Sequence, residues 1–261
     1  MGKDRPRRQT EDVLRVNWEL EGAPTGAPSL LMMTVRSEPH FFGRRKGKSL
    51  RPRQAALTEN LLPVLRVDVG ALPQFCLTKA APYKDLWLEI GFGGGEHLAS
   101  DAQGHPDVLL IGCEPFVNGV AKLVSTIDEK NIQNIRIHDG DALEILRALP
   151  DASLGRITIL YPDPWPKFGQ RKRRFISPET IQQMARTLRG GEEVHFATDI
   201  DDYSGWTLAR FQASDSFDWK AREANDWTTP WAGWPGTRYE AKAFREGRTP
   251  AYLTFVRKAR C

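Results

Sequence analysis

Cysteine and histidine are scarce in this sequence, and neither residue type forms a cluster. The 261 residues include 3 cysteines, at positions 76, 113 and 261, with no C-x-x-C spacing and an odd total. This pattern supports neither a disulfide framework nor a zinc site. The 5 histidines are scattered along the chain, so we expect no metal site and no histidine base. So few cysteines favour a reducing, cytoplasmic location.

Long apolar runs are also absent. No stretch approaches the roughly 18 apolar residues that a membrane span requires. Residues 1–21 carry charges throughout, unlike a signal peptide with its apolar centre. We therefore expect a soluble protein without a membrane segment. The sequence shows no internal repeat, and it predicts no particular oligomeric state.

The net charge is small, but the basic residues gather in two segments. The chain holds 37 Lys and Arg against 33 Asp and Glu, a formal net charge of +4, with a pI near 9.0. Residues 36–53 contain seven Arg or Lys and one acid, and residues 167–174 contain five and no acid. Two basic segments beside a mixed remainder are typical of a protein that binds a polyanion.

Composition divides the chain into three parts. Residues 1–37, with a Gly/Pro stretch at 22–28, predict a disordered extension. Residues 38–85 predict a basic arm with a helix, and residues 86–261 predict one α/β domain. In this domain we expect strands at 86–90, 108–113, 135–138, 156–161, 193–197 and 251–256. Helices are expected at 96–103, 115–129, 142–149, from 178 to the glycines at 190–191, and at 203–213. This alternation predicts a doubly wound, mostly parallel α/β sheet.

The most informative segment is Tyr161-Pro162-Asp163-Pro164-Trp165-Pro166-Lys167, which directly follows an apolar run. Such a run predicts a buried parallel strand, whose carboxyl end lies where open α/β sheets bind their ligands. Prolines on both sides restrict the backbone of Asp163 and so orient its carboxylate. Trp165 offers a flat face for a base, and the cations that follow suit phosphates. The segment thus indicates chemistry on a nucleic acid, and the alternative is a Pro-rich turn with solvated charges.

A glycine turn follows the first predicted strand of the domain, in Leu88-Glu89-Ile90-Gly91-Phe92-Gly93-Gly94-Gly95. It does not fit the dinucleotide fingerprint G-x-G-x-x-G, which weakens the case for a nicotinamide cofactor. The acid Glu89 would repel a diphosphate but would favour the cationic sulfonium and amino group of S-adenosylmethionine. Glu114 after the second strand is placed for ribose hydroxyls, and Asp141 after the third is placed for an adenine amino group. Each acid alone could be a helix cap, but three at successive strand ends converge on one crevice.

Six ordered motifs resemble those of the tRNA (guanine-N7-)-methyltransferase family over about residues 38–258. The motifs are Glu89-Ile90-Gly91-Phe92-Gly93, Gly112-Cys113-Glu114, Asp141-Ala142, Pro162-Asp163-Pro164-Trp165-Pro166-Lys167, Ala197-Thr198-Asp199 and Thr237-Arg238-Tyr239-Glu240. The resemblance implies a seven-stranded Rossmann-like methyltransferase fold. It also implies methyl transfer from S-adenosylmethionine to N7 of a guanine in the tRNA variable loop, at position 46. The Trp-rich stretch 227–234 departs from the family pattern.

The resemblance assigns roles to individual residues. It implies a catalytic Asp163 and a cofactor site formed by Glu89, Gly91, Gly93, Glu114, Asp141 and Asp163. Residues implied to contact the target nucleotide are Lys167, Asp199, Thr237, Arg238, Tyr239 and Glu240. The two basic segments supply the expected tRNA contacts: Arg44, Arg45, Lys46 and Lys48 from the arm, and Arg171, Lys172, Arg173 and Arg174 after the Pro-Asp-Pro-Trp motif.

The chemistry of guanine N7 agrees with these residues. N7 carries an exposed lone pair and no proton, so methyl transfer needs in-line alignment and no general base. Asp163 would hold the donor edge of guanine and stabilise the positive charge that reaches the ring. Three alternatives remain at this point: a methyltransferase for an exocyclic amine, a nucleotide-dependent oxidoreductase and a non-catalytic RNA-binding module.

Overall fold

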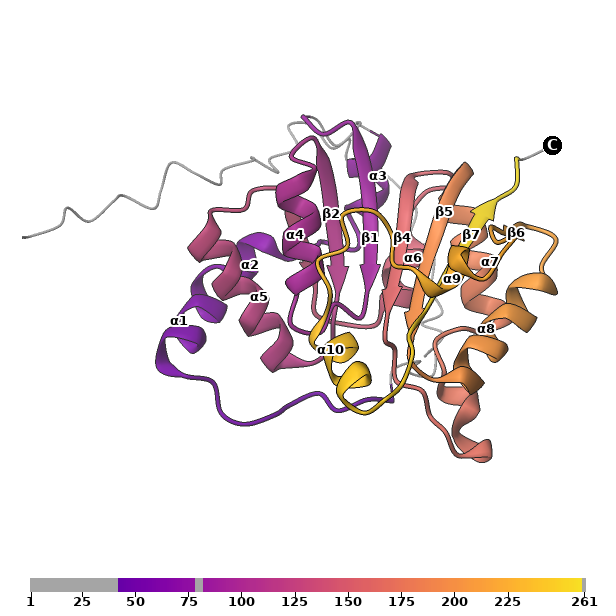
Figure 1. Ribbon diagram of the computed structural model, residues 1–261. Helices are drawn as coiled ribbons and strands as arrows, with labels where there is room; N and C mark the ends of the chain where they lie inside the picture. The colour runs from indigo at the N-terminus through magenta and orange to yellow at the C-terminus, as the bar shows by residue number, and fades with distance from the viewer. Residues whose placement is uncertain (1–41, 78–81, 260–261) are drawn as a thin grey trace, which may run out of the picture. The chain divides into compact units, whose positions relative to one another are not determined.

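The computed structural model describes residues 42–77 and 82–259, which belong to one compact unit. Within them a seven-stranded sheet has the order β3-β2-β1-β4-β5-β7-β6 (Figure 1). Five strands are parallel: β1 (Asp85–Ile90), β2 (Val108–Cys113), β3 (Ile135–His138), β4 (Leu154–Leu160) and β5 (Leu188–Thr198). The last two, β7 (Ala251–Arg257) and β6 (Phe217–Trp219), run antiparallel to their neighbours. The doubly wound, mostly parallel sheet predicted from the sequence is thereby confirmed.

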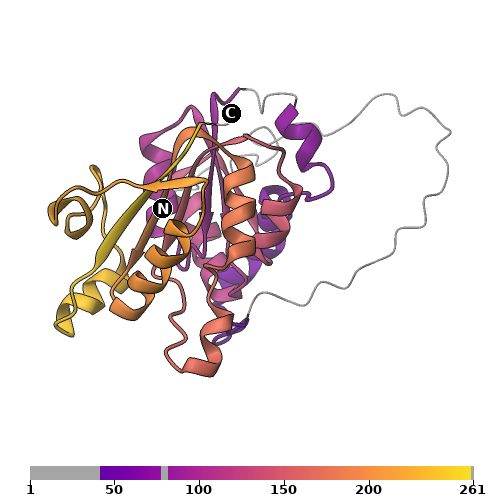
Figure 2. The same ribbon diagram turned by 90° about the vertical axis from the view of Figure 1, so that its right-hand side faces the viewer.

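Helices cover both faces of the sheet (Figure 2). On one face, α4 (Glu96–Gly104) and α5 (Val117–Lys130) bury Leu98, Leu123 and Val124 against Leu110 of β2. The helices α1 (Pro52–Asn60) and α2 (Leu62–Leu65) lie on the same side, where α2 contributes its two leucines to this core. Because side chains alternate along a strand, Leu109 and Ile111 of β2 point into the opposite core.

The opposite core lies beneath α6 (Ala142–Ala148), α7 (Pro178–Thr187) and α8 (Asp201–Gln212). The helix α3 (Leu72–Leu77) adds Leu72 to it. Ser177 and Thr180 form a capping box at the start of α7, and Pro178 occupies its first turn, as the sequence predicts. Every residue of β2 is buried, because helices cover both faces of this parallel strand. This burial explains why its sequence is a continuous apolar run and not an alternating one.

Two details differ from the sequence-based expectation. Gly190 and Gly191 were expected to close α7, but this helix ends at Thr187 and both glycines lie within β5. β4 and β5 pair at Leu154 and Leu188 and next at Arg156 and Glu193, so a register shift leaves extra residues on β5, and the two glycines are among them. Several short elements were not expected: two of the three helices in residues 38–85, where one helix was expected, and β6, the 3-10 helix η1 (Phe168–Arg173), α9 (Asn225–Thr228) and α10 (Arg238–Arg245).

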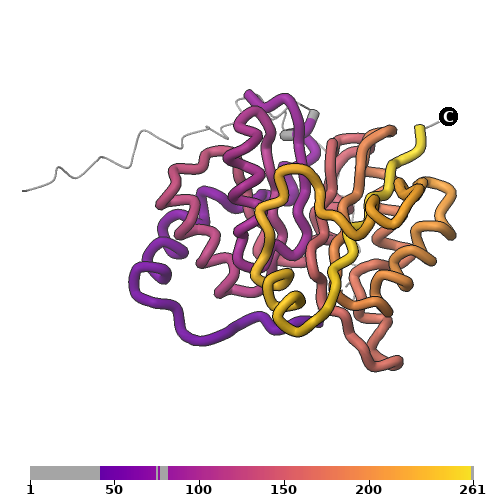
Figure 3. Tube along the Cα trace, in the orientation of Figure 1, coloured from indigo at the N-terminus to yellow at the C-terminus, as the bar shows by residue number. Residues whose placement is uncertain are grey.

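Three segments from distant parts of the sequence gather at the carboxyl edge of the parallel strands. The arm at residues 42–51 passes below this edge beside α10, and η1 extends from the end of β4 (Figure 3). The arm is bonded to α5, because Val117 N donates to the carbonyl of Arg45 at 2.9 Å and Gly47 N donates to Asn118 Oδ1 at 2.7 Å. The predicted extension at 1–37 lies outside the described residues. No helix among the described residues is long and apolar enough to cross a membrane.

Candidate active site

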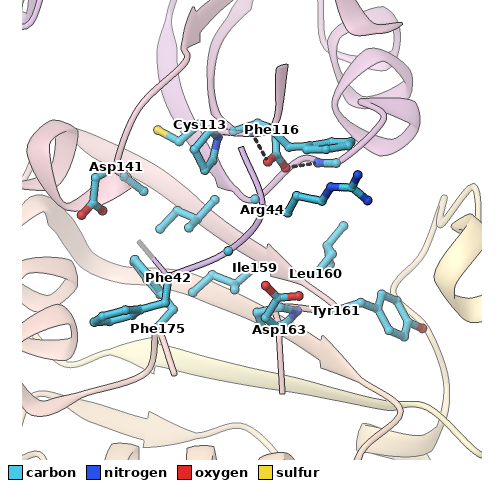
Figure 4. Close-up of a pocket in the computed structure, with 18 of the residues that line it drawn as sticks. Phe42, Arg44, Cys113, Phe116, Asp141, Ile159, Leu160, Tyr161, Asp163 and Phe175 are labelled. Atoms are coloured by element: carbon cyan, nitrogen blue, oxygen red, sulfur yellow. Dashed lines mark hydrogen bonds between the residues drawn. The ribbon is translucent and has the colours of Figure 1, made fainter. Parts of the chain in front are cut away.

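A cavity of about 340 Å³ opens at the carboxyl ends of β1, β2, β3 and β4. The strand order reverses between β1 and β4, and this switch point is where open α/β sheets hold their ligands. Residues of the arm, of η1 and of α10 complete the wall. In Figure 4, Asp141 and Asp163 reach the cavity from different sides, and Arg44 of the arm enters between the strands' ends and Phe116.

The glycine turn after β1 forms one wall of the cavity. Gly91 and Gly93 both have a positive φ, 74° and 56°, which L side chains rarely adopt. A side chain at Gly93 would also approach Arg238 and Tyr239, since an added Cβ would lie 3.4 Å from the former and 3.5 Å from the latter. The glycine therefore permits both the turn and the close approach of α10.

Glu114 joins the end of β2 to this turn. Its Oε2 accepts a hydrogen bond from Gly93 N at 2.7 Å, and its Oε1 accepts one from Phe116 N at 2.9 Å. The residue is buried, 8% exposed, and lines the cavity. Burial raises the pKa of the Glu114 carboxyl, and the negative charge of Asp163 raises it further. A cation in the cavity would offset both effects.

Asp141 lies at the end of β3, as predicted, and lines the same cavity. It is the N-cap of α6, where its Oδ1 accepts a hydrogen bond from Leu143 N at 3.0 Å. The cap fixes the position of the carboxylate. The structure thus brings Asp141 together with Glu114 and Asp163 on one cavity.

Glu89 has a different environment from the other acids. Its side chain is 4% exposed, does not line the cavity and accepts a hydrogen bond from His97 Nδ1 at 2.7 Å. Burial alone would lower the pKa of His97, but the charge of Glu89 and this hydrogen bond raise it overall. Glu89 is thus bonded to α4 behind the glycine turn, and its predicted contact with the cofactor stays a prediction.

Asp163 is held by a strained loop. The residues on either side of Pro162-Asp163-Pro164, Tyr161 and Trp165, have positive φ values of 48° and 42°. Non-glycine residues in this region cost of order 1–3 kcal/mol each and tend to cluster at functional sites. The Asp163 side chain lines the cavity (Figure 4), and desolvation raises the pKa of its carboxyl. This loop orients the carboxylate as the flanking prolines predicted.

Arg174 does not have the surface position expected of a tRNA contact. Its side chain is 0% exposed and forms an ion pair with Asp202. Its Nε donates to the carbonyl of Pro164 at 2.7 Å, and its guanidinium lies 4.8 Å from the centre of the Tyr203 ring. This burial argues against a tRNA contact for Arg174, because its guanidinium is bonded to the loop around Asp163 through Pro164 and to α8 through Asp202.

The other cations of both basic segments are accessible to different degrees. Lys167 and Lys172 are exposed, and Arg171 is half-buried in an ion pair with Asp202 at 2.7 Å. Arg173 lines the cavity, with its guanidinium 5.0 Å from the centre of the Trp165 ring. In the arm all four predicted cations are exposed, namely Arg44, Arg45, Lys46 and Lys48.

The predicted contacts with the target nucleotide fall into two groups. Arg238 and Tyr239 line the cavity from the first turn of α10, and Thr237 is the N-cap of that helix. Asp199 does not line the cavity; its Oδ2 accepts a hydrogen bond from Arg248 Nε at 2.7 Å. Glu240 is 8% exposed and bonded within the protein.

Comparison with known proteins places the chain in a family. Residues 83–253 match the family described as "Putative methyltransferase". The tRNA (guanine-N(7)-)-methyltransferase of Chelativorans sp. is 50% identical over 224 residues, which cover 85% of this chain and 97% of that protein. The enzyme of the same name from Mesorhizobium japonicum is 51% identical, with the same coverage. This chain belongs to the tRNA (guanine-N(7)-)-methyltransferase family. Among solved structures, the 16S rRNA methyltransferase KamB aligns with 67% of the chain and 89% of its own, at 19% identity and a TM-score of 0.48.

The sequence did not predict some of the residues that line the cavity of this tRNA (guanine-N(7)-)-methyltransferase family member. Phe42, Phe116 and Phe175 line the cavity, and nothing in their sequence spacing predicts that they meet. α10 did carry a signal, because Thr237 and Glu240 have the spacing of a helix-capping box. Among the described residues, no group of three or more His, Cys, Asp and Glu could hold a metal ion.

Proposed function

We propose that this protein transfers the methyl group of S-adenosylmethionine to N7 of the guanine at position 46 in the variable loop of tRNA. One observation supports this most directly: Asp163 and Glu114 share a cavity bordered by the arm and η1, two cationic segments. A small-molecule cavity beside an extended cationic rim fits a cofactor that reacts with a large polyanion. Relatives about 50% identical over nearly their whole length bear the name of this reaction.

The charged groups and the glycine turn of the cavity suit S-adenosylmethionine. The cofactor supplies an electrophilic methyl group on a sulfonium, beside an amino and a carboxylate group. Glu114 and Asp163 would lie near the positive groups, which would relieve the effect of burial on Glu114. Arg44 and Arg238 line the cavity too and would pair with the carboxylate. Gly91 and Gly93 let the ligand approach the backbone closely.

Two carboxylates would position the adenosine part. Both oxygens of Glu114 already accept one backbone hydrogen bond, which leaves a further lone pair on each for the ribose hydroxyls. Asp141 at the end of β3 would accept a hydrogen bond from the adenine amino group. Glu89 would support this site from behind through His97.

Asp163 would act on the guanine without removing a proton. N7 has a lone pair and no hydrogen, so the reaction needs the base held in line with the methyl group. The carboxylate would accept hydrogen bonds from the donor edge of guanine and stabilise the charge that develops on the ring. Losing one such preorganised group costs about 3 kcal/mol of transition-state stabilisation. Arg238 and Tyr239 would close over the base from α10, and Lys167 would contact it from the rim.

The tRNA backbone would lie across the two cationic segments. The arm contributes Arg44, Arg45, Lys46 and Lys48, and the segment after Asp163 contributes Lys172 with Arg171 and Arg173 at its sides. In this arrangement residues 1–37 would form an extension, residues 38–85 the basic arm and its helix, and residues 86–261 the methyltransferase domain. A cytoplasmic location agrees with a tRNA substrate and stays a prediction.

Identifying the methylated nucleoside tests the proposal. The protein is incubated with methyl-labelled S-adenosylmethionine and tRNA that lacks 7-methylguanosine, and the product is digested to nucleosides and separated. Label in 7-methylguanosine, which accumulates far more slowly when Asp163→Asn replaces the wild type, is the expected result. Label in a guanosine methylated on its exocyclic amine would contradict the proposal, and so would tRNA binding without any transfer of label.

A further inference from the structure

The Trp-rich stretch 227–234, unexplained by the family motifs, connects β5, α4 and α10. Trp231 stacks on His195 of β5, with ring centres 4.5 Å apart and planes inclined by 7°, and its Nε1 donates to Thr254 Oγ1 at 2.8 Å. Trp234 lies against His97 of α4, with ring centres 5.1 Å apart. In Figure 1 the segment between α9 and α10 crosses in front of β4 and β1, in agreement with these contacts.

The same two tryptophans pack beneath the loop that holds Asp163. Trp231 and Trp234 join a cluster with Leu160, Ala197 and the buried Tyr252. Tyr161 belongs to this cluster as well, and it directly precedes Pro162-Asp163. The ring of Tyr161 also stacks with that of Tyr239 on α10, with centres 6.3 Å apart. One cluster therefore supports both the Asp163 loop and α10.

Glu240 is the polar centre of this cluster. Its Oε1 accepts hydrogen bonds from Trp234 Nε1, at 2.8 Å, and from the hydroxyl of Tyr252. Its backbone N donates to Thr237 Oγ1 at 3.1 Å, which closes the first turn of α10. Burial and the charge of Glu240 raise the pKa of Tyr252, so that hydroxyl stays protonated and remains a donor.

Few side chains of α10 are buried. Of its eight residues, Glu240 and Ala243 are buried, and Phe244 is 59% exposed. A helix with such a small apolar contact depends for its position on its hydrogen bonds. Here these are the bonds from Trp234 and Tyr252 to Glu240, which we call the tether of α10. The first turn of this helix carries Arg238 and Tyr239, which line the cavity directly above Gly93. A shift of the tether would move both side chains.

We infer that Glu240 is a positioning residue, which Trp234 and Tyr252 hold so that α10 presents Arg238 and Tyr239 to the cavity. This inference rests on the proposed function, and it replaces the direct contact between Glu240 and the target nucleotide that the family resemblance implied. A carboxylate that grips a base must reach the cavity. Glu240 is 8% exposed, is absent from the cavity wall and already accepts two hydrogen bonds through one oxygen.

A double-mutant cycle with Trp234→Phe and Glu240→Ala tests the inference. Trp234→Phe keeps an aromatic ring but removes the N–H donor to Glu240. Each single variant should lower kcat/KM for tRNA, by up to about 10²-fold when the geometry of the site is misplaced. Because both act through one tether, the double variant should lose no more than the worse single variant. Losses that multiply would overturn the inference, since Glu240 would then act independently of Trp234.

Glu240→Gln supplies a second test, which does not depend on the alanine variant folding. Glutamine keeps the acceptor for Trp234 but removes the charge, so kcat/KM should stay within a few-fold of the wild type. A residue that grips the donor edge of guanine by its charge would lose activity with glutamine as with alanine. Loss of activity in Glu240→Gln at an unchanged thermal midpoint would therefore overturn the inference.

Trp227→Phe is the matched control, because Trp227 belongs to the same stretch but is 36% exposed on α9. It should leave kcat/KM unchanged. The wild type in the same assay separates the two levels of the argument. If the wild type forms no 7-methylguanosine, the proposed function fails; if it does and the losses multiply, the role of Glu240 alone fails.

Discussion

At the scale of single residues, the orientation of Asp163 depends on contacts that the surrounding loop makes elsewhere. Tyr161 and Trp165 adopt left-handed backbone conformations on either side of it, and Arg174 holds the carbonyl of Pro164 from below. The family motif predicts Asp163 at the reaction centre, and the structure shows how a short loop aims its carboxylate at the cavity.

Asp163→Asn should slow methyl transfer by about 10²–10³-fold, the usual effect of removing one preorganised electrostatic group. Asparagine has the same size but lacks the charge that the methylated guanine requires. Cofactor affinity should change much less, because Glu114, Asp141 and the glycine turn remain. Single-turnover rates on tRNA, measured beside calorimetric binding of S-adenosylmethionine, check this. Wild-type turnover in the variant would exclude a catalytic role for Asp163.

Glu114→Ala should weaken S-adenosylmethionine binding by ~1.5–3 kcal/mol, the range for hydrogen bonds to a charged group, and affect tRNA binding far less. The pH dependence of affinity has a definite sign. Burial raises the pKa of Glu114, so acidification should protonate this carboxylate at a higher pH than an ordinary glutamate. Cofactor binding should weaken over the same pH range. Titration calorimetry across this range should show a flatter profile in Glu114→Ala; parallel profiles would remove Glu114 from the cofactor site.

At the scale of elements, the segment after Asp163 combines a structural residue with surface cations. Arg174 is buried against Asp202 and Pro164, whereas Lys172, on η1, is exposed. The charge run looks uniform in the sequence, but the short 3-10 helix turns successive side chains to different sides. Only the fold distinguishes a side chain that is bonded to the Asp163 loop from one that is exposed to solvent.

Lys172→Ala and Arg174→Ala form a matched pair that separates these roles. Lys172→Ala should weaken tRNA binding and lower the slope of log affinity against log salt by up to about 0.7–0.9, the value for one lost phosphate contact, with no change in thermal midpoint. Arg174→Ala should lower the thermal midpoint, because it leaves the carbonyl of Pro164 and Asp202 without their buried partner. Filter binding at several salt concentrations measures the first effect, and thermal melting measures the second. If both variants changed tRNA affinity and thermal midpoint equally, the two residues would not have separate roles.

The sequence predicted the long elements that bury an apolar face and missed several short ones, even in the segment that holds α2 and α3, whose leucines reach the cores. Strands such as β2 and helices such as α5 were found within two residues of their ends, because continuous or periodic apolar residues mark them. β6 has three residues, and α10 buries too few side chains to show a period. Pairings such as Glu89 with His97 and Arg174 with Asp202 join different elements, so the spacing of the sequence carries no sign of them.

At the scale of the whole molecule, the arm and the α/β domain meet around the cavity. Arg44 lines the cavity while the backbone that follows is bonded to α5 through Val117 and Asn118. The arm therefore holds cations beside the cofactor site, where a tRNA phosphate would approach the reacting base. We therefore expect residues 42–48 to take part in both tRNA binding and methyl transfer.

Two truncations should separate the arm from the sequence that precedes it. Removing residues 1–31 should leave tRNA methylation close to that of the full chain, because no family motif lies there. Removing residues 1–48 should weaken tRNA binding and transfer strongly, since Arg44, Arg45, Lys46 and Lys48 are lost together. Steady-state methylation of tRNA compares the three proteins. Equal losses in both truncations would assign a function to residues 1–31, and no loss in either would refute the arm.

The atom that receives the methyl group is the central claim, and a transcript with 7-deazaguanine at position 46 tests it most directly. This base keeps the donor edge that Asp163 would hold but has carbon in place of N7, so it lacks the nucleophilic lone pair. The unmodified transcript should accept close to one methyl group per molecule, and the 7-deaza transcript should accept none while binding the protein with similar affinity. Equal methylation of both transcripts would contradict methyl transfer to N7 of this guanine.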